Sequence, residues 1–266
     1  MAVNDDEIYM GYAPVYAAIG QAWVGLQAWT TLQRWLTARS WRGQTAADWG
    51  CGTGEVAVAL AEAGYAVIGV DIAAAMLARA ADVARSRGVA VTWHHGDIRD
   101  WTPPETAFDL VVSFYDTFNY LTDDGALADV IGRAGAALRG GGVLAFDVNT
   151  LIEYASWDER ATVTADNANY FVYNILHFDA VTQRAEGRIV WFERVEAGWR
   201  RGEETHIQRP WRDAEIVAAL QTAGFTLEAR LTLEGAPTNP ATATRILYIA
   251  QRALSECSHD DQVLLQ

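Results

Sequence analysis

The sequence contains no lysine, because all twenty of its basic residues are arginine. It therefore lacks the lysine of a phosphate-binding P-loop and the lysine that forms a Schiff base with pyridoxal phosphate. Cysteine is nearly as scarce, since Cys51 and Cys257 are the only two in 266 residues. So few thiols fit a reducing compartment.

Net positive charge and long apolar segments are also missing. The formal net charge is −14 and the pI is about 4.7. This balance disfavours nucleic acid as a partner, because basic side chains supply most of the affinity for phosphates. Residues 1–7 are acidic and do not indicate a secretory signal, and the longest apolar run, residues 56–77, is interrupted by glycines and acidic residues. We expect a soluble, cytoplasmic protein without nucleic-acid or membrane partners.

The most informative segment is the run Asp48-Trp49-Gly50-Cys51-Gly52-Thr53-Gly54. The apolar residues before it predict a short buried strand, and the spacing over residues 55–63 predicts a helix that Gly64 ends. A second strand over residues 65–70 delivers Asp71 at its carboxyl end, where α/β sheets place ligand-binding groups. Glycines allow close approach to the backbone, and a carboxylate accepts hydrogen bonds from both hydroxyls of a ribose. The pattern predicts a nucleoside-containing cofactor.

The sixth position of the glycine turn separates two such cofactors. A dinucleotide fingerprint requires glycine there so that a pyrophosphate can sit at the helix N-terminus, but this chain has Glu55. Its carboxylate would repel phosphates, whereas Asp48 suits a ligand with a positive amino group. S-adenosylmethionine has that amino group, a ribose and an adenine, and no phosphate. A nicotinamide-dependent oxidoreductase is the alternative, disfavoured by Glu55 and by the helical segment before the first strand.

These motifs resemble those of class I S-adenosylmethionine-dependent methyltransferases of the small-molecule branch, and the resemblance covers residues 44–150. In that family the Asp-x-Gly-x-Gly-x-Gly segment holds the methionine part of the cofactor. The resemblance therefore implies that role for Asp48, Gly50, Cys51, Gly52 and Gly54.

Other parts of the chain match further cofactor contacts of the family. The acidic residue after the second strand binds ribose, a later Gly-Asp-hydrophobic segment binds the adenine amino group, and the end of the fourth strand faces cofactor and substrate. Small-molecule members often cover the cofactor or touch the substrate with an N-terminal tyrosine. The residues so implied are Tyr9, Asp71, Ile72, Met76, Asp97, Ile98, Ser113 and Phe114, with Tyr12 as a second N-terminal tyrosine.

The order of predicted elements is typical of a parallel sheet wound on both faces. One or two helices over residues 11–38 precede the first strand. The remaining predictions are a helix over 72–87 ended by Gly88, strands over 89–95 and 108–113, a helix capped by Asp123 or Asp124 and reaching Leu138, and a turn at Gly140-Gly141-Gly142 into a strand over 143–148. We therefore expect an α/β fold with a Rossmann-like, doubly wound, mostly parallel sheet.

The region between residues 150 and 211 breaks this alternation. Residues 162–177, 184–194 and 199–208 have the period-two alternation of antiparallel strands, with turns near Asp179 and at Glu196-Ala197-Gly198. The resemblance implies that such an insertion shapes the substrate pocket. The expected organisation is a helical cap over 1–43, a core over 44–150 and 212–252, an inserted antiparallel lid over 151–211, and a tail over 253–266.

Methyl transfer from a sulfonium is an in-line displacement, so alignment and exclusion of water can supply most of the rate. A hydroxyl or ammonium acceptor would also need a base, for which the candidates are Tyr12, Asp116 and His206, while Asn119, Tyr120 and Asn149 could orient the acceptor. His94-His95 lacks further ligands nearby in the sequence, so no metal is expected.

The sequence thus predicts transfer of a methyl group from S-adenosylmethionine to a small molecule, with S-adenosylhomocysteine as the product. An amine nitrogen is the favoured acceptor. An O-methyltransferase and a non-catalytic regulator that binds S-adenosylmethionine stay open, as does assembly into a homodimer.

Overall fold

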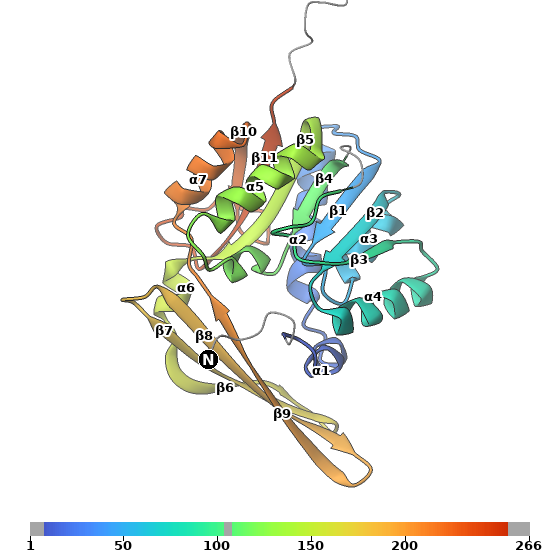
Figure 1. Cartoon of the computed structure of the whole chain (residues 1–266), viewed down its shortest axis with the longest axis vertical. Helices are drawn as coiled ribbons and strands as arrows, with labels where there is room; N and C mark the ends of the chain where they lie inside the picture. Colours follow the sequence, from blue (N-terminus) through green and yellow to red (C-terminus); the bar gives the residue numbers. More distant parts are fainter. Residues whose placement is uncertain (1–7, 104–107, 255–266) are drawn as a thin grey trace, which may run out of the picture.

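A computed structural model describes residues 8–103 and 108–254. A seven-stranded sheet has the order β10-β11-β5-β4-β1-β2-β3, and a separate four-stranded sheet has the order β6-β7-β8-β9. Figure 1 shows the large sheet between layers of helices, with the small sheet beyond one end of its strands. The predicted fold class, an α/β Rossmann-like fold with preceding helices and an inserted antiparallel sheet, is confirmed.

The large sheet forms from short apolar segments, most of them buried on both faces. Its first five strands pair in parallel, and β11 runs antiparallel between β5 and β10. The strands are β1 (Thr45–Trp49), β2 (Ala66–Asp71), β3 (Thr92–His95), β4 (Phe108–Ser113), β5 (Leu138–Asn149), β10 (Phe225–Leu231) and β11 (Arg245–Arg252).

Helices pack on both faces of this sheet. On one face, side chains of α2 (Trp23–Ala38) and α3 (Glu55–Glu62) share an apolar core with β1, β4 and β5. On the other, α5 (Ala126–Ala137) and α7 (Asp213–Thr222) enclose a second core. Helix α4 (Ala74–Arg87) lies against α3, and α1 (Ala13–Ala18) lies against α4.

The strand order reverses between β1 and β4. The chain moves from β1 toward β2 and β3 on one side, and from β4 toward β5 on the other. Connections therefore diverge at the carboxyl ends of β1 and β4 and leave a crevice there, which is where open α/β sheets bind ligands. The glycine turn after Trp49 and the segment after Ser113 both lie at this point.

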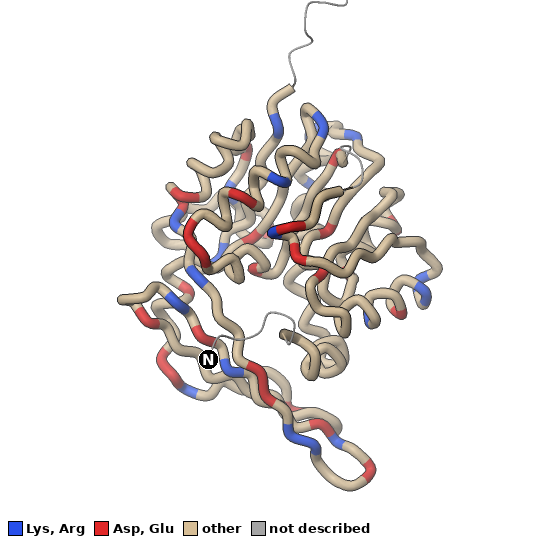
Figure 2. The backbone as a smooth tube through the Cα atoms, viewed as in Figure 1, with Lys and Arg blue, Asp and Glu red and all other residues tan. Residues whose placement is uncertain are grey.

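The inserted sheet consists of β6 (Asp158–Asp166), β7 (Tyr170–Asp179), β8 (Arg184–Val195) and β9 (Gly198–Gln208), and it follows the short helix α6 (Leu151–Ala155). All neighbouring strands are antiparallel. The β8–β9 hairpin extends away from the core (Figure 1), and basic and acidic residues alternate along it (Figure 2). Ion pairs such as Arg188–Glu203, at 2.6 Å, balance positive and negative charge on this surface.

The glycine triplet before the fifth strand does not form the predicted turn. Gly140, Gly141 and Gly142 lie inside β5, where the register against β4 shifts between Phe108 and Leu110. A Cβ atom on Gly142 would lie 2.9 Å from a carbonyl oxygen of its own strand and 3.1 Å from one of β4. The glycines therefore permit an irregular stretch of strand pressed against its neighbour.

Two further boundaries differ from the prediction. Helix α5 begins at Ala126 with Gly125 as its N-cap, in the left-handed region at φ 86°, so neither Asp123 nor Asp124 caps it. The stretch 162–177 contains two strands, because the Asn167 side-chain oxygen accepts hydrogen bonds from the backbone of Asn169 and Tyr170 and turns the chain. Residues 1–7 of the predicted cap and 255–266 of the predicted tail lie outside the described residues.

Candidate active site

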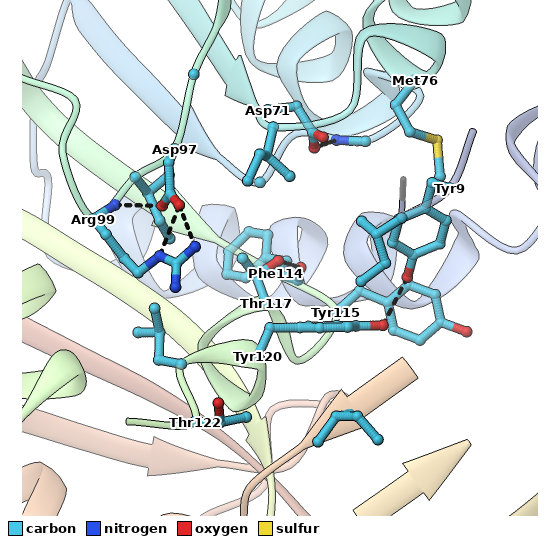
Figure 3. A pocket seen from close by; sticks show the side chains of 18 of the residues that line it. Tyr9, Asp71, Met76, Asp97, Arg99, Phe114, Tyr115, Thr117, Tyr120 and Thr122 are labelled. Carbon is cyan, nitrogen blue, oxygen red and sulfur yellow. Dashed lines mark hydrogen bonds and ion pairs between the residues drawn. The ribbon is translucent and has the colours of Figure 1, made fainter. Parts of the chain in front are cut away.

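A cavity of about 430 Å³ opens at the carboxyl ends of β1, β2 and β4, within the range of about 300–1,000 Å³ that small-molecule sites occupy. Its wall combines the core with the N-terminal segment and strand β9 (Figure 3). The predicted site residues that line it are Tyr9, Gly50, Gly52, Asp71, Ile72, Met76, Asp97, Ile98, Phe114 and Tyr120.

The glycine turn forms one side of the cavity with bare backbone. Gly50 and Gly52 have φ angles of 70° and 53°, a region in which side chains are strained. A Cβ on Gly50 would lie 2.4 Å from Thr117, whereas one on Gly52 would meet nothing within 4 Å. Because Gly52 lines the cavity, the space beside it is open to a ligand, and a side chain there would fill it.

Asp71 lies at the end of β2 and is 8% exposed. Its two carboxylate oxygens accept hydrogen bonds from the backbone N–H groups of Gly52 at 2.7 Å and Ala73 at 2.8 Å. These bonds fix the carboxylate at the cavity wall, and each oxygen retains a lone pair for a ligand hydroxyl. Burial raises the pKa of this carboxyl, and the two backbone bonds oppose the rise.

Asp97 and Arg99 lie across the cavity from Asp71 (Figure 3). The Asp97 carboxylate accepts hydrogen bonds from the Arg99 backbone N–H and from its Nε, both at 2.7 Å. Arg99 is therefore the cation closest to this carboxylate, and its pairing with Asp97 was not apparent from the sequence.

Four residues predicted to bind the cofactor lie behind the cavity wall. Asp48 is 2% exposed, and its Oδ2 has no hydrogen-bond partner within the part of the chain that the structure describes. Burial, with Asp71 nearby, raises its pKa to about 8. Cys51 is also buried. A Cβ atom added to Gly54 would lie 2.6 Å from the Cβ of Ala80, so this glycine packs against α4. The Ser113 hydroxyl donates a hydrogen bond to the carbonyl oxygen of Trp49 at 2.8 Å. These four shape the turn from behind.

Four tyrosine side chains dominate the opposite wall. Tyr9 and Tyr16 come from the N-terminal segment, Tyr115 follows β4, and Tyr120 ends the 3-10 helix η2 (Thr117–Tyr120). Their rings are neighbours, with centroids 6.0 Å apart for Tyr9 and Tyr16 and 6.3 Å apart for Tyr16 and Tyr115. Burial raises the pKa of all four phenols, that of Tyr115 to about 12, so they stay neutral at physiological pH.

The segment after β4 is held by a buried ionic cluster. Tyr115 and Asp116 have φ angles of 61° and 52°, and Asp147 accepts hydrogen bonds from both of their backbone N–H groups. Arg245 pairs with Asp147 and, at 2.7 Å, with Asp116, while Gln208 donates to the other Asp116 oxygen at 2.6 Å. Both oxygens of Asp116 are therefore occupied away from the cavity, which supports a role in holding Tyr115 in place rather than contact with an acceptor.

The other predicted catalytic residues also lie off the cavity wall. Tyr12 is fully buried and packs on Trp191 of β8, with ring centroids 5.2 Å apart. His206 of β9 is 4% exposed and lies behind Tyr120, whose hydroxyl is 3.0 Å from its Nδ1. His206 can therefore reach the cavity only through another side chain.

Of the predicted acceptor-orienting residues, only Tyr120 lines the cavity. The Asn119 amide donates to the carbonyls of Asn149 and Arg209 and accepts from Asn149 N at 2.9 Å. Asn119 thus joins η2 to β5 and to the chain after β9, and both asparagines are buried.

The sequence prediction did not assign a site role to Tyr16, Thr117, Thr122 or Asp123, although all line the cavity. A signal for Tyr16 was present, because Tyr9, Tyr12 and Tyr16 follow one another at helical spacing. Nothing local in the sequence marks Thr122 and Asp123, which reach the cavity because η2 turns the chain back across the crevice.

Among the described residues, no helix is both long and apolar enough to cross a membrane. Nor does the described part contain three or more histidine, cysteine or acidic side chains grouped to hold a metal ion.

Comparison with known proteins accounts for this arrangement. Residues 46–142 match the model of a methyltransferase domain family. A protein of Geobacillus sp. (strain WCH70) that carries the name methyltransferase is 28% identical over 207 residues, which cover 77% of this chain and 83% of the relative. Residues 46–142 of the chain therefore form a methyltransferase domain.

Solved structures share the fold of this methyltransferase. An S-adenosylmethionine-dependent methyltransferase from Clostridium acetobutylicum superposes with a TM-score of 0.81 at 21% identity, covering 92% of this chain and 99% of the other. An amino pentose methyltransferase from Micromonospora echinaspora, solved with S-adenosylmethionine bound, gives a TM-score of 0.70 at 22% identity, covering 91% and 96%. These two structures show that the chain shares their fold over nearly its whole length.

Proposed function

We propose that the methyltransferase acts on an amine nitrogen of a small molecule, bound between the four cavity tyrosines and the rim formed by Thr122 and Asp123. The observation that carries this proposal is the tyrosine wall itself. Aromatic faces attract cations, and an aliphatic amine arrives as an ammonium. A carboxylate at the rim adds to that attraction.

The residues present fit the cofactor. Gly50 and Gly52 would offer bare backbone to its methionine part, and Asp71 would accept hydrogen bonds from the ribose hydroxyls. Ile72, Met76 and Ile98 are apolar residues of the cavity wall that would contact the adenine, and Asp97 would accept from its amino group. When bound, S-adenosylmethionine supplies an electrophilic methyl group on a sulfonium centre.

The chain itself contributes to the reaction by positioning the reactants and by excluding water from them. The Asp147–Arg245–Asp116 cluster fixes Tyr115 in an unfavourable backbone conformation. Tyr9 and Tyr16 close the cavity from the N-terminal side, and Ile207 of β9 closes it from the lid side. The acceptor is thereby held between the tyrosine side chains, facing the cofactor, in a largely aromatic space that excludes water.

The relatives support a small-molecule acceptor without identifying it. The Micromonospora protein is an amino pentose methyltransferase, and its superposition covers 91% of this chain. The net charge of −14 further favours a cationic acceptor over an anionic one.

Matched acceptors test the proposal. The purified protein is incubated with S-adenosylmethionine and either glucosamine, glucose, benzylamine or benzyl alcohol, and both S-adenosylhomocysteine release and the mass of the acceptor are measured. We expect one added methyl group on an amine and none on its alcohol counterpart.

Methylation of the alcohols instead would identify an O-methyltransferase. Tight calorimetric binding of S-adenosylmethionine without turnover, across these and a wider amine panel, would instead favour a non-catalytic binding protein. Either result would refute the amine proposal.

A further inference from the structure

A line of polar groups leads from the cavity into the inserted sheet. The Tyr9 and Tyr120 hydroxyls are 2.9 Å apart, and the Tyr120 hydroxyl is 3.0 Å from His206 Nδ1. His206 Nε2 lies 3.6 Å from Glu204 Oε2. Tyr9 and Tyr120 line the cavity, whereas His206 and Glu204 do not. The line therefore connects the acceptor space to an imidazole that solvent barely reaches.

The partners fix the direction of these hydrogen bonds. His206 Nε2 makes no hydrogen bond within the described part of the chain, but the Glu204 carboxylate 3.6 Å away favours a proton on Nε2 and leaves Nδ1 as the acceptor. The Tyr120 hydroxyl then donates to Nδ1, and its oxygen accepts from the Tyr9 hydroxyl. The remaining lone pair of Tyr9 is available to a donor in the cavity. The two phenols stay neutral because burial raises their pKa, so the imidazole nitrogen is the proton acceptor at the end of this line.

Glu204 completes the arrangement on the far side of His206. Its Oε2 accepts from Tyr9 N at 2.9 Å, and its Oε1 accepts from Gly11 N at 2.8 Å and Tyr12 N at 3.0 Å. The same carboxylate thus positions the backbone that carries Tyr9 and faces the imidazole. An imidazolium at His206 would lie next to this carboxylate, which stabilises the charge that proton uptake creates.

We infer that Tyr9, Tyr120 and His206 form a proton relay that deprotonates an ammonium acceptor, with Glu204 stabilising the protonated His206. The inference rests on the proposed amine acceptor. An N–H bond of the ammonium breaks, and its proton passes to Tyr9 while the Tyr9 proton passes to Tyr120 and the Tyr120 proton to His206 Nδ1. The nitrogen keeps the electron pair and becomes the nucleophile. His206 later returns its proton along the same path to the solvent.

The first test needs neither cofactor nor acceptor. Long-range proton–nitrogen NMR spectra of protein labelled with ¹⁵N-histidine report the tautomer of each imidazole, and His206→Asn identifies the His206 signals. The groups facing His206 are Tyr9, Tyr120 and Glu204. In the neutral form of the ring we expect the proton on Nε2, and a change in the Nδ1 signal in Tyr120→Phe. A proton on Nδ1 in the neutral ring, or a ring charged throughout the assay pH range, would overturn the relay.

The second test separates proton transfer from packing. In His206→Asn, the amide oxygen can still accept from Tyr120 but cannot take up a proton. The matched control is His177→Asn, at an exposed position of β7. With benzylamine, which is charged at neutral pH, we expect kcat of His206→Asn to fall about a hundredfold with little change in KM. With aniline, which is already neutral, we expect a loss of less than about threefold. Equal losses on both amines would refute the relay.

The two proposals fail separately. If the wild-type protein methylates alcohols and no amine, the proposed function is wrong. The NMR spectrum then still shows independently whether His206 Nδ1 is free to accept a proton from Tyr120. If amines are methylated but the two variants of His206 and His177 behave alike, the relay is wrong and the proposed function stands.

Discussion

Replacing Asp71 with alanine tests the cofactor site most directly. The change removes the acceptor of two backbone hydrogen bonds, at 2.7 and 2.8 Å, from the end of β2. A hydrogen bond to a charged group contributes about 1.5–3 kcal/mol, and water entering from the cavity can hydrate one of the freed N–H groups. We therefore expect the free energy of unfolding to fall by about 2–3 kcal/mol.

The effect on the cofactor should be separable from this loss of stability. A lost acceptor for the ribose hydroxyls weakens binding by more than about tenfold, which corresponds to about 1.4 kcal/mol. Calorimetric titration with S-adenosylmethionine and S-adenosylhomocysteine measures affinity, and urea unfolding measures stability. Asp109→Ala is the control, because Asp109 also accepts backbone N–H bonds but lies at the opposite end of the strands. If Asp71→Ala loses stability but binds both ligands normally, the ribose does not lie at Asp71.

Three other substitutions test separate parts of the structure. Gly52→Val should abolish detectable cofactor binding. Gly88 has a similar positive φ but lies outside the cavity, so Gly88→Val should bind the cofactor normally. Equal losses of binding in both variants would mean that Gly52 matters only for its backbone conformation. Burial raises the pKa of Asp48 to about 8, above an unfolded value of about 3.9. The folded state therefore binds the extra proton between about pH 4 and 8, and stability falls as pH rises through that window. Asp48→Asn cannot ionise, so between pH 4 and 8 it should gain up to about 5–6 kcal/mol of stability relative to the wild type in urea unfolding. Parallel pH profiles would contradict the assignment. Arg245→Met leaves two buried carboxylates unpaired and should cost about 3–5 kcal/mol, against less than about 1 kcal/mol for Arg85→Ala at an exposed pair; a similar loss for both would show that the cluster is hydrated.

The core could be predicted from sequence because its signals are local. A buried strand, the glycine turn and the helix from Glu55 to Glu62 occupy adjacent residues, and Asp71 follows the next strand directly. The same locality explains the errors in detail. The glycine triplet at 140–142 has the composition of a turn, but its conformation depends on the neighbouring strand β4, which no short window contains.

The acceptor side of the site was less predictable because its contacts join distant segments. Asp116 was a reasonable candidate base by position, but its oxygens are taken by Gln208 and Arg245, 92 and 129 residues away. His206 carried no local signal of function, and only the folded chain brings it to Tyr120. Sequence reasoning thus identified residues at the right end of the sheet, and the three-dimensional partners determine what each can do.

The bonds from Glu204 to the backbone of Tyr9, Gly11 and Tyr12 also have a consequence for engineering. These bonds join two pieces of chain that are nearly 200 residues apart, so the two form one structural unit. A chimera that receives the inserted sheet of a relative without residues 8–18 would separate the carboxylate from the loop it organises. Transplanting both segments together keeps that unit intact and is the rational way to exchange substrate range between such enzymes.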